Sequence, residues 1–304
     1  MKRRRGSSYL HGMSRTSNVV IIVILVLLAA LCIFPMLLVV AISLSTEAEV
    51  RRLGFSLIPR GFSVHSYQFL FNDVTTIMRS AGISVFITVL GSIVSLVIIA
   101  LYAYPISRKD FQYKRLFSFM LFFTMLFNGG LVPWYMVYVN MLNLKNTVWV
   151  LIIPSLFTPF YVLIMRSFFT TSIPDSLVEA AKIDGAHELI LFSRIVLPLS
   201  KPGLATIGLF NAIAYWNDWF KPLLFITEQK LMPLQYLLYR MQVTIQVLKD
   251  MASRGMLSME EIMNVPDLTA RMAMCVLVIL PVVFAYPFFQ QYFITGLTLG
   301  AIKD

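Results

Sequence analysis

EAAKIDGAHELILFSRIVLP, residues 179–198, is a polar, helix-prone stretch that lies between two apolar runs of the chain. Small side chains at Ala180 and Ala181 let another surface approach closely, and Glu179 places an anionic group beside them. Gly185 can take the positive φ that ends a helix and turns the chain. The stretch therefore predicts two short helices that meet at a glycine corner.

A capping pattern and two prolines bound this corner. Ser176, with Glu179 three residues later, fits a capping box, and Pro174 suits the first turn of the helix. Pro198 and Pro202 break the second helix, so the chain can enter a bilayer at a new angle. Taken alone, the stretch could equally be a capped amphipathic helix on a membrane surface.

The composition is that of a membrane protein. Of the 304 residues, 58% are hydrophobic and only 13% are charged, whereas about a quarter are charged in soluble domains. The hydrophobic residues lie in separate runs of roughly twenty residues, which is the length that a bilayer core requires. We therefore predict an all-α polytopic membrane protein.

Six apolar runs predict six transmembrane helices in one membrane domain, 19–293. The first run follows a basic arm, 1–18, and is too long for a signal peptide. Such an arm could bind nucleic acid, but its place beside a span favours a role in topology. The predicted spans are Val19–Ile42, Ile83–Tyr104, Leu116–Tyr138, Val148–Met165, Leu204–Ile226 and Met272–Phe293.

The distribution of Lys and Arg orients these spans. Basic residues gather in the segments predicted inside, most densely in 105–115, so both termini are expected in the cytoplasm. The inside segments are 1–18, 105–115, the loop 166–203 and the tail 294–304, and the outside loops are 43–82, 139–147 and 227–271.

No catalytic or metal-binding pattern is visible in the sequence. Cys32 and Cys275 lie in apolar runs, and the three histidines, His11, His65 and His187, lie far apart without ligand spacing. A nucleotide-binding P-loop needs Gly-Lys, and the sequence contains no such pair. We predict a non-catalytic subunit without a cofactor of its own, so any ATP would be bound by a partner subunit.

Small residues and helix breakers occur inside three predicted spans. Ser84, Thr88 and Ser92 share one helical face, which favours close helix packing. Asn128-Gly129-Gly130 interrupts the third span, and Pro154 and Pro159 interrupt the fourth. Irregular backbone in a bilayer fits a transport route, but glycine and proline are also common in ordinary membrane helices.

The fifth span offers a possible substrate path at Asn211, Tyr215, Trp216 and Asn217. Aromatic faces beside amide groups suit a sugar, which stacks on rings and hydrogen-bonds through its hydroxyls. The alternative is helix packing or the aromatic belt at the outer membrane interface. Asn211 lies deeper than such a belt, and a polar group in lipid needs a partner.

The outside segment 227–271 contains apolar residues at helical spacing, which predicts an amphipathic helix. Such a helix could lie on the membrane or dock with an external partner. The residues at this spacing are Leu234, Leu237, Leu238, Met241, Ile245 and Leu248.

The spacing in residues 179–198 resembles the EAA loop of ABC importer permeases, EAA-x3-G-x9-I-x-LP, at every named position. The resemblance extends over nearly the whole chain and is to the smaller permease of maltose-type carbohydrate importers. The stretches LPLSKPGLATIGLF and YWNDWF are similar to the subgroup that imports oligosaccharides, including uronate- or pectin-derived ones.

The resemblance implies a type I ABC importer permease in the bacterial plasma membrane. Its expected partners are a second, related permease in a heterodimer, two ATPase subunits, an external solute-binding protein and an oligosaccharide, which moves by alternating access. In such pairs the larger permease holds most of the sugar. The cytoplasmic EAA coupling helices that seat in an ATPase cleft would include Glu179, Ala180, Ala181, Asp184, Gly185, Ile195, Leu197 and Pro198.

The tail ends in G-L-T-x-G-A-x-K and is not obviously helical. The resemblance implies a second ATPase contact there, although a tail of this kind could simply be disordered. The residues concerned are Gly296, Leu297, Thr298, Gly300 and Lys303.

Two other classes of protein share some of these features. A permease for a non-sugar solute, such as an amino acid, would carry the same EAA loop, but the residues after the loop and the tail favour sugar. A stand-alone channel or a membrane-embedded enzyme fits less well, because neither needs this loop and no catalytic cluster is present.

Overall fold

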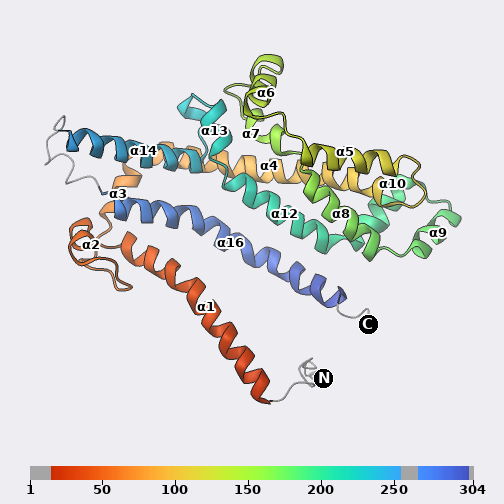
Figure 1. Ribbon diagram of the computed structural model, residues 1–304, viewed down its shortest axis with the longest axis horizontal. Helices are drawn as coiled ribbons and strands as arrows, with labels where there is room; N and C mark the ends of the chain where they lie inside the picture. Colours follow the sequence, from red (N-terminus) through yellow and green to blue (C-terminus); the bar gives the residue numbers. More distant parts are fainter. Residues whose placement is uncertain (1–14, 255–265, 301–304) are drawn as a thin grey trace. The chain divides into compact units, whose positions relative to one another are not determined.

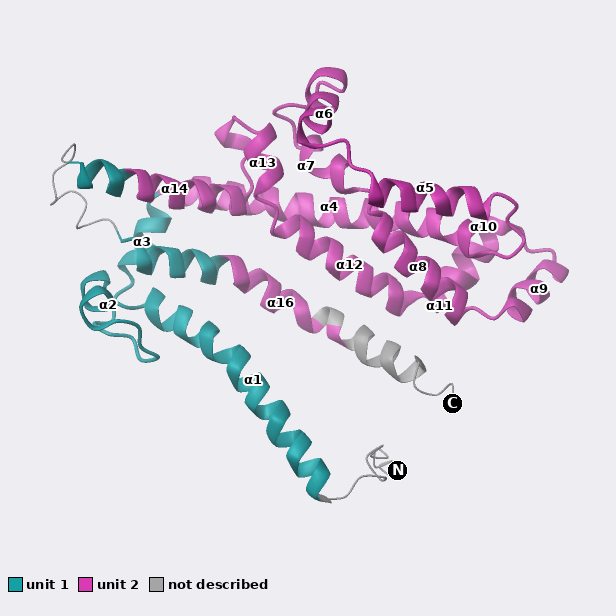
Figure 2. Cartoon of the chain, in the orientation of Figure 1, with its two compact units in different colours: residues 1–72, 248–277 teal, residues 73–247, 278–304 magenta. Residues whose placement is uncertain are grey.

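A computed structural model describes residues 15–254 and 266–300, and they form helices, with one isolated antiparallel bridge between Ser45 and Phe62 (Figure 1). The chain divides into two compact units, one of residues 1–72 and 248–277 and the other of 73–247 and 278–304 (Figure 2).

The helices confirm an all-α membrane fold. Three described helices are long and apolar enough to cross a bilayer by themselves: Thr16–Ser43, His65–Ser107 and Leu268–Pro287. The total reaches six if each bent pair of helices counts as one span. The bent pairs are Lys114–Leu126 with Leu131–Met141, Trp149–Ser155 with Pro159–Ser172, and Glu188–Leu199 with Lys201–Trp216.

The first two predicted spans lie within single long helices, α1 (Arg15–Ser43) and α4 (Val74–Ser107). Helix α4 begins earlier than predicted because Asp73 caps it, its carboxylate accepting a hydrogen bond from the Thr76 amide at 3.1 Å. The short helices between these two are α2 (Glu47–Leu53), α3 (His65–Leu70) and η1 (Phe71–Asp73).

The third and fourth spans are broken where the sequence predicted interruptions. The chain bends by 112° at Asn128–Gly130, where Gly130 has a φ of 88°. A second bend of 51° lies between Ser155 and Pro159. The helices on either side are α5 (Lys114–Leu126), α6 (Leu131–Met136), the π-helix η2 (Val137–Met141), α7 (Trp149–Ile152), η3 (Ile153–Ser155) and α8 (Pro159–Ser172).

The prediction of one continuous fifth span, Leu204–Ile226, is wrong. Helix α12 (Lys201–Trp216) ends at Trp216, and a separate short helix, α13 (Phe220–Phe225), follows it. Asp218 causes the restart, because its carboxylate accepts hydrogen bonds from the amides of Phe220 and Lys221, each at 3.2 Å.

Helices α4, α8 and α12 lie side by side in the second unit (Figure 1), and small residues allow this close packing. A Cβ added at Gly91 would lie 2.6 Å from the ring of Tyr215, and one at Gly203 would lie 2.7 Å from the ring of Phe168. Ser84 on the same face of α4 accepts a hydrogen bond from the Leu234 amide at 2.8 Å. The packing role predicted for this face is confirmed.

Two further predictions concern the last third of the chain. The amphipathic helix is confirmed as α14 (Leu234–Ser253), in which Leu234, Leu238 and Ile245 are buried. The expectation of a non-helical tail is wrong as far as Gly300, because α16 (Leu268–Gly300) extends to that residue. No proline follows Pro287 in this stretch to stop the helix. A short turn, η5 (Gln229–Leu231), precedes α14.

The start of α16 is held by Glu47 within the first unit. The Glu47 carboxylate accepts hydrogen bonds from the amides of Asp267, Leu268 and Thr269, and from the Thr269 hydroxyl at 2.9 Å. A carboxylate at a helix N-terminus satisfies free amides and is favoured by the helix dipole. Although burial raises the pKa of Glu47, the hydrogen bonds from Thr269, Arg51 and Leu268 together outweigh it and hold the pKa below its ordinary value.

Replacing Glu47 by alanine is expected to loosen the start of α16. The three amides lose their shared carboxylate acceptor, which should cost about 2 kcal/mol or more. Since about 1.4 kcal/mol corresponds to a factor of ten, the amides of 267–269 should exchange with solvent at least tenfold faster. Because the folded pKa of Glu47 is lowered, its contribution is complete at neutral pH and is lost as the pH falls below 4.5. Hydrogen-exchange mass spectrometry at neutral pH measures this.

The matched control is Glu49→Ala, on the same helix, because the one ion pair of Glu49 among the described residues is an exposed pair with Arg52 at 3.6 Å. It should leave exchange at 267–269 unchanged. Equal exchange in the Glu47→Ala and Glu49→Ala proteins would contradict the assignment of Glu47 as the anchor of α16.

Candidate functional site

The stretch quoted at the outset forms most of a bent segment, residues 175–199, that we call the elbow. Gly185 lies at its corner with a φ of 80°, and the Ala186 amide donates to the Ala181 carbonyl at 2.9 Å, which is a Schellman ending. The predicted pair of helices at a glycine corner is confirmed. The elbow consists of α9 (Asp175–Ile183), α10 (Glu188–Ile190), the π-helix η4 (Leu191–Val196) and α11 (Leu197–Leu199).

The predicted capping box is wrong. Pro174, with a ψ of 137°, is the N-cap residue, and its carbonyl accepts a hydrogen bond from the Leu177 amide at 3.1 Å. The helix therefore begins at Asp175, two residues too early for Ser176 to cap it, and no side chain makes the capping hydrogen bond. The predicted exit bend is present, because the elbow meets α12 at 79°.

The inner side of the elbow packs against the second unit. Val178 and Ala181 of α9 are buried at 1% and 9% exposure, and Leu191, Phe192 and Val196 follow them beyond the corner. All five residues join a hydrophobic core with residues of α4 and α8. Ala181 therefore contacts its own chain, and Ile195 and Leu197 pack partly against the same core.

The outer side of the elbow is exposed, and we define its outer face as Glu179, Ala180, Ile183, Asp184 and Leu189. Ile183 is 85% exposed and Leu189 is 77% exposed. Large apolar side chains beside polar positions are typical of a protein interaction surface. Gly185 and Pro198 are also exposed.

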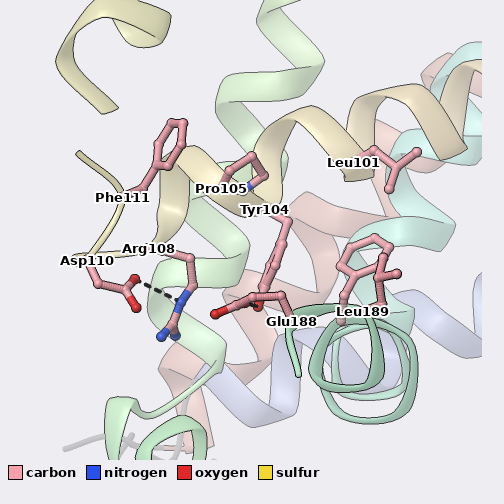
Figure 3. A pocket seen from close by; sticks show the side chains of 9 residues that line it. Leu101, Tyr104, Pro105, Arg108, Asp110, Phe111, Glu188 and Leu189 are labelled. Carbon is pink, nitrogen blue, oxygen red and sulfur yellow. Dashed lines mark hydrogen bonds and ion pairs between the residues drawn. The ribbon is translucent and has the colours of Figure 1, made fainter. Parts of the chain in front are cut away.

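A cluster of ionic and polar side chains joins the elbow to the loop 108–113, which connects α4 to α5. The ammonium of Lys182 lies 2.6 Å from Asp110 Oδ2 and 2.9 Å from Glu188 Oε1. The hydroxyl of Tyr104, near the end of α4, donates to Glu188 Oε2 at 2.5 Å. Figure 3 shows Tyr104, Asp110 and Glu188 from these three elements close together.

Two cations of the loop 108–113 also take part in the cluster. Arg108 Nε lies 3.5 Å from Asp110 Oδ1, and Lys109 Nζ lies 2.6 Å from Asp175 Oδ2 (Figure 3 shows the first pair). The hydrogen bond from Lys182 holds the pKa of Asp110 below its usual value, and Asp110 in turn raises the pKa of Lys182. Both groups are therefore charged at neutral pH.

An open cavity of about 430 Å³ lies beside the cluster. Its walls are mostly apolar, and the charged groups on its wall are already paired with each other or with Lys182. The lining residues are Leu101, Tyr104, Pro105, Arg108, Asp110, Phe111, Glu188, Leu189 and Phe192 (Figure 3).

The cluster was not predicted from the sequence. In the sequence the basic residues of 105–115 indicate only topology, and no local pattern marks Lys182 or Glu188. Lys182 and Asp110 are 72 residues apart, so no local spacing connects them. The one available signal was an acid, Asp110, within a run of basic residues.

None of the cavities described among residues 15–254 and 266–290 is lined by more than one of the four residues of the possible substrate path. The Tyr215 hydroxyl donates to the Ile152 carbonyl at 2.9 Å, and Trp216 Nε1 donates to the Val278 carbonyl at 3.1 Å. Asn217 accepts a hydrogen bond from Gln235 at 3.2 Å. Trp216 lines a mainly apolar cavity of about 170 Å³, and the other three are not among its lining residues.

Asn211 differs from the other three, because it is only 2% exposed and its Nδ2 has no hydrogen-bond partner among the described residues. An unsatisfied buried amide costs about 1–3 kcal/mol. We therefore expect Asn211→Leu to raise the melting temperature of the purified transporter by about 2 °C or more. A lower melting temperature would contradict the unpaired state of this amide.

The same variant also tests the predicted substrate path. If Asn211 contacts the passing solute, Asn211→Leu lowers the rate of uptake although the protein is more stable. Thermal unfolding and uptake are therefore measured on the same preparation. An unchanged rate of uptake would remove Asn211 from the path.

The remaining predicted contacts lie partly outside the described residues. The backbone is described at Gly296, Leu297, Thr298 and Gly300, but the side chains of 291–300 are not, and Lys303 lies outside the described residues. Within the part of the chain that the structure describes, no group of three or more His, Cys, Asp or Glu residues could hold a metal ion.

Comparison with known protein families gives a match over residues 80–298. The matching family is described as "Binding-protein-dependent transport system inner membrane component". The elbow, 175–199, lies wholly within the matched region.

Several characterised bacterial proteins are similar over most of their length. The chain is 38% identical over 291 residues to the polygalacturonan/rhamnogalacturonan transport system permease protein YtcP of Bacillus subtilis, covering 95% of this chain and 99% of the relative. It is 39% identical over 274 residues to the protein LplC of Bacillus subtilis, covering 90% of each. It is 26% identical to the arabinooligosaccharides transport system permease protein AraQ of Halalkalibacterium halodurans, covering 91% of this chain and 93% of the relative.

One solved structure is similar in fold. A chain of a bacterial ABC transporter involved in the import of the acidic polysaccharide alginate superposes with a TM-score of 0.75 and is 29% identical in sequence. The match covers 92% of this chain and 99% of that chain.

Proposed function

Because the chain belongs to the family of binding-protein-dependent transport system inner membrane components, we propose that it is the membrane-spanning permease subunit of an ATP-driven importer for oligosaccharides. The chain is a multi-pass membrane protein of this family, and the proposed location is the bacterial plasma membrane. The subunit provides the pathway for the solute and takes its energy from a partner.

The observation that carries the proposal is the two-sided elbow. Its inner side is fixed to the core of the spans through Val178 and Ala181, and its outer face exposes Ile183 and Leu189. An ATPase that binds the outer face can therefore move the spans through the inner side. A helix that merely lies on a lipid surface would bury its apolar residues in the lipid. The two-sided arrangement of the elbow therefore supports a coupling role more strongly than a role in lipid binding.

The residues of the predicted coupling site divide into two roles. We assign Glu179, Ala180 and Asp184 to contact with the ATPase, because these side chains are exposed. Gly185 and Pro198 shape the corner and the exit. Ala181, Ile195 and Leu197 hold the elbow to its own core.

The proposed assembly contains this chain, a second related permease, two ATPase subunits and an external solute-binding protein. The elbow and both termini lie in the cytoplasm in this proposal, and the tail makes a second ATPase contact. Basic residues after α4 and at the start of α5 support this orientation, because short cytoplasmic connections accumulate Lys and Arg. They are Arg108, Lys109, Lys114 and Arg115.

The proposed solute is an oligosaccharide delivered by the binding protein. The names of the relatives support this class, because they refer to polygalacturonan and rhamnogalacturonan, to arabinooligosaccharides, and to alginate. Two of these names concern acidic sugar polymers, so oligogalacturonides are a suitable first probe.

The test is uptake by the complete transporter in proteoliposomes. We expect labelled oligogalacturonides or arabinooligosaccharides to enter only when both ATP and the binding protein are present. Entry without ATP would indicate a channel and contradict the proposal. Uptake of amino acids in place of either sugar would keep the permease assignment and contradict the proposed solute.

A further inference from the structure

We propose that Lys182 is a positioning residue that braces the glycine corner, so that a push on the outer face of the elbow turns α4 instead of bending the corner. This inference rests on the proposed coupling function. It concerns the way in which force passes from the elbow to the spans, and the residues that carry it were not part of the predicted site.

The corner is held by the backbone hydrogen bonds of its Schellman ending, from Ala186 to Ala181 and from Gly185 to Lys182. A Cβ added at Gly185 would meet no atom within 4 Å, so packing does not support the turn. Helix α9 is attached to the core through only two buried residues, Val178 and Ala181. The helix that receives the push is thus joined to the rest of the elbow by a flexible residue.

Lys182 connects the two sides of this corner and a third element. Its ammonium lies 2.9 Å from Glu188, which is the first residue of α10 beyond the corner. The same ammonium lies 2.6 Å from Asp110 in the loop 108–113. One side chain therefore holds α9, α10 and this loop at fixed separations.

The connections form a closed ring that begins and ends on α4. Tyr104 of α4 binds Glu188, Glu188 binds Lys182, Lys182 binds Asp110, and the chain returns from Asp110 to α4 through Arg108. A closed ring resists bending at every member, whereas a single contact does not. The ring directs a displacement of α9 into α4, which packs along α8 and α12.

The charges of the ring balance. The two carboxylates, Asp110 and Glu188, face the two cations, Lys182 and Arg108. Lys182 is 39% exposed and Asp110 is 52% exposed, so these pairs add little to the stability of the fold. Their effect is expected in coupling, which depends on geometry, and not in the melting temperature.

The test compares transport with ATP hydrolysis in the complete transporter, reconstituted with the partner permease, both ATPase subunits and the binding protein. In Lys182→Met we expect the number of sugar molecules imported per ATP to fall about fivefold, while ATP hydrolysis and the melting temperature stay near the original values. Lys182→Arg can still bridge two carboxylates, so this variant should import about as many sugar molecules per ATP as the unaltered transporter.

Arg115→Met is the matched control. Arg115 is an exposed cation at the start of α5 and makes no ion pair among the described residues. Its removal should leave the ratio of import to hydrolysis unchanged. An equal fall in Arg115→Met and Lys182→Met would show a general effect of charge and overturn the proposal.

A covalent replacement of the ion pair tests the brace directly. The double variant Asp110→Cys, Lys182→Cys is prepared without the native thiols, Cys32 and Cys275, both of which are exposed. We expect it to couple poorly and to recover when a short bifunctional thiol reagent joins the two positions. Failure of the joined protein to recover would overturn the proposal.

The outcomes separate this proposal from the proposed function. If the unaltered transporter shows no uptake that depends on ATP, the coupling function itself fails. If the unaltered transporter works and Lys182→Met keeps its full ratio, only the brace is overturned. If Lys182→Met does not assemble, Asp110→Asn is used instead, because it removes one link of the ring without changing the elbow. A full number of sugar molecules imported per ATP in Asp110→Asn would then overturn the brace.

Discussion

Gly185→Pro should abolish the stimulation of ATP hydrolysis by substrate, while the protein still inserts into the membrane. Gly185 has a φ of 80°, whereas proline fixes φ near about −65°. Proline also removes the amide that donates to the Lys182 carbonyl at 3.1 Å. The Schellman ending is lost, so the outer face of the elbow no longer presents one surface to the ATPase.

ATP hydrolysis by the reconstituted transporter, with and without substrate and binding protein, measures this effect. Gly185→Ala should show a smaller defect, because an alanine in the left-handed region costs about 1–2 kcal/mol. Gly82→Ala is the matched control, since Gly82 lies in α4 at negative φ and an added Cβ there meets nothing within 4 Å. Full stimulation in Gly185→Pro would contradict the coupling assignment.

Ile183→Asp should weaken the binding of the ATPase subunits at least tenfold. Ile183 is 85% exposed at the end of α9, and burying an isoleucine side chain is worth about 1.5–3 kcal/mol. The substitution removes this gain and places a second carboxylate directly beside Asp184. The dissociation constant is measured by titrating ATPase subunits onto the permease pair in lipid nanodiscs.

Ile183→Leu keeps the apolar surface and should bind the ATPase normally. If Ile183→Asp also binds with unchanged affinity, then Ile183 lies outside the contact and the outer face as defined here is wrong. Insertion of both variants into the membrane serves as the check that the spans are intact.

The elbow was predictable because its shape depends on local chemistry. A glycine that can take positive φ, and prolines that stop a helix, act on their immediate neighbours, so Gly185 and the exit near Pro198 could be read from the sequence. The broken third span followed from Asn128-Gly129-Gly130 in the same way. The long apolar runs likewise predicted α1, α4 and α16.

The errors arose where two local signals competed. The pair Ser176 and Glu179 fits a capping box, but Pro174 caps the helix instead and starts it two residues earlier. The apolar run of the fifth span continues through Phe225, but Asp218 captures two amides and starts a new helix. In both cases one hydrogen-bonding or conformational constraint outweighed a sequence pattern.

The ionic cluster and the division of the elbow into two sides could not be predicted. Asp110 and Lys182 meet only because the fold brings the loop 108–113 to α9, and Tyr104 and Glu188 meet because it brings α4 to α10. Ala180 and Ala181 are adjacent residues of the same type, yet Ala180 is exposed and Ala181 is buried. Such differences depend on which face of α9 meets the core.

The central claim is that the elbow is a cytoplasmic seat for an ATP-hydrolysing partner, and site-specific crosslinking from Ala180 tests it most directly. Ala180 is exposed on α9 and belongs to the outer face. A photoreactive residue at this position, in the transporter assembled in its own membrane, is predicted to capture an ATPase subunit, with a yield that changes when ATP binds. Capture of no ATPase, or labelling of the position by a reagent confined to the outside of the cell, would contradict the account.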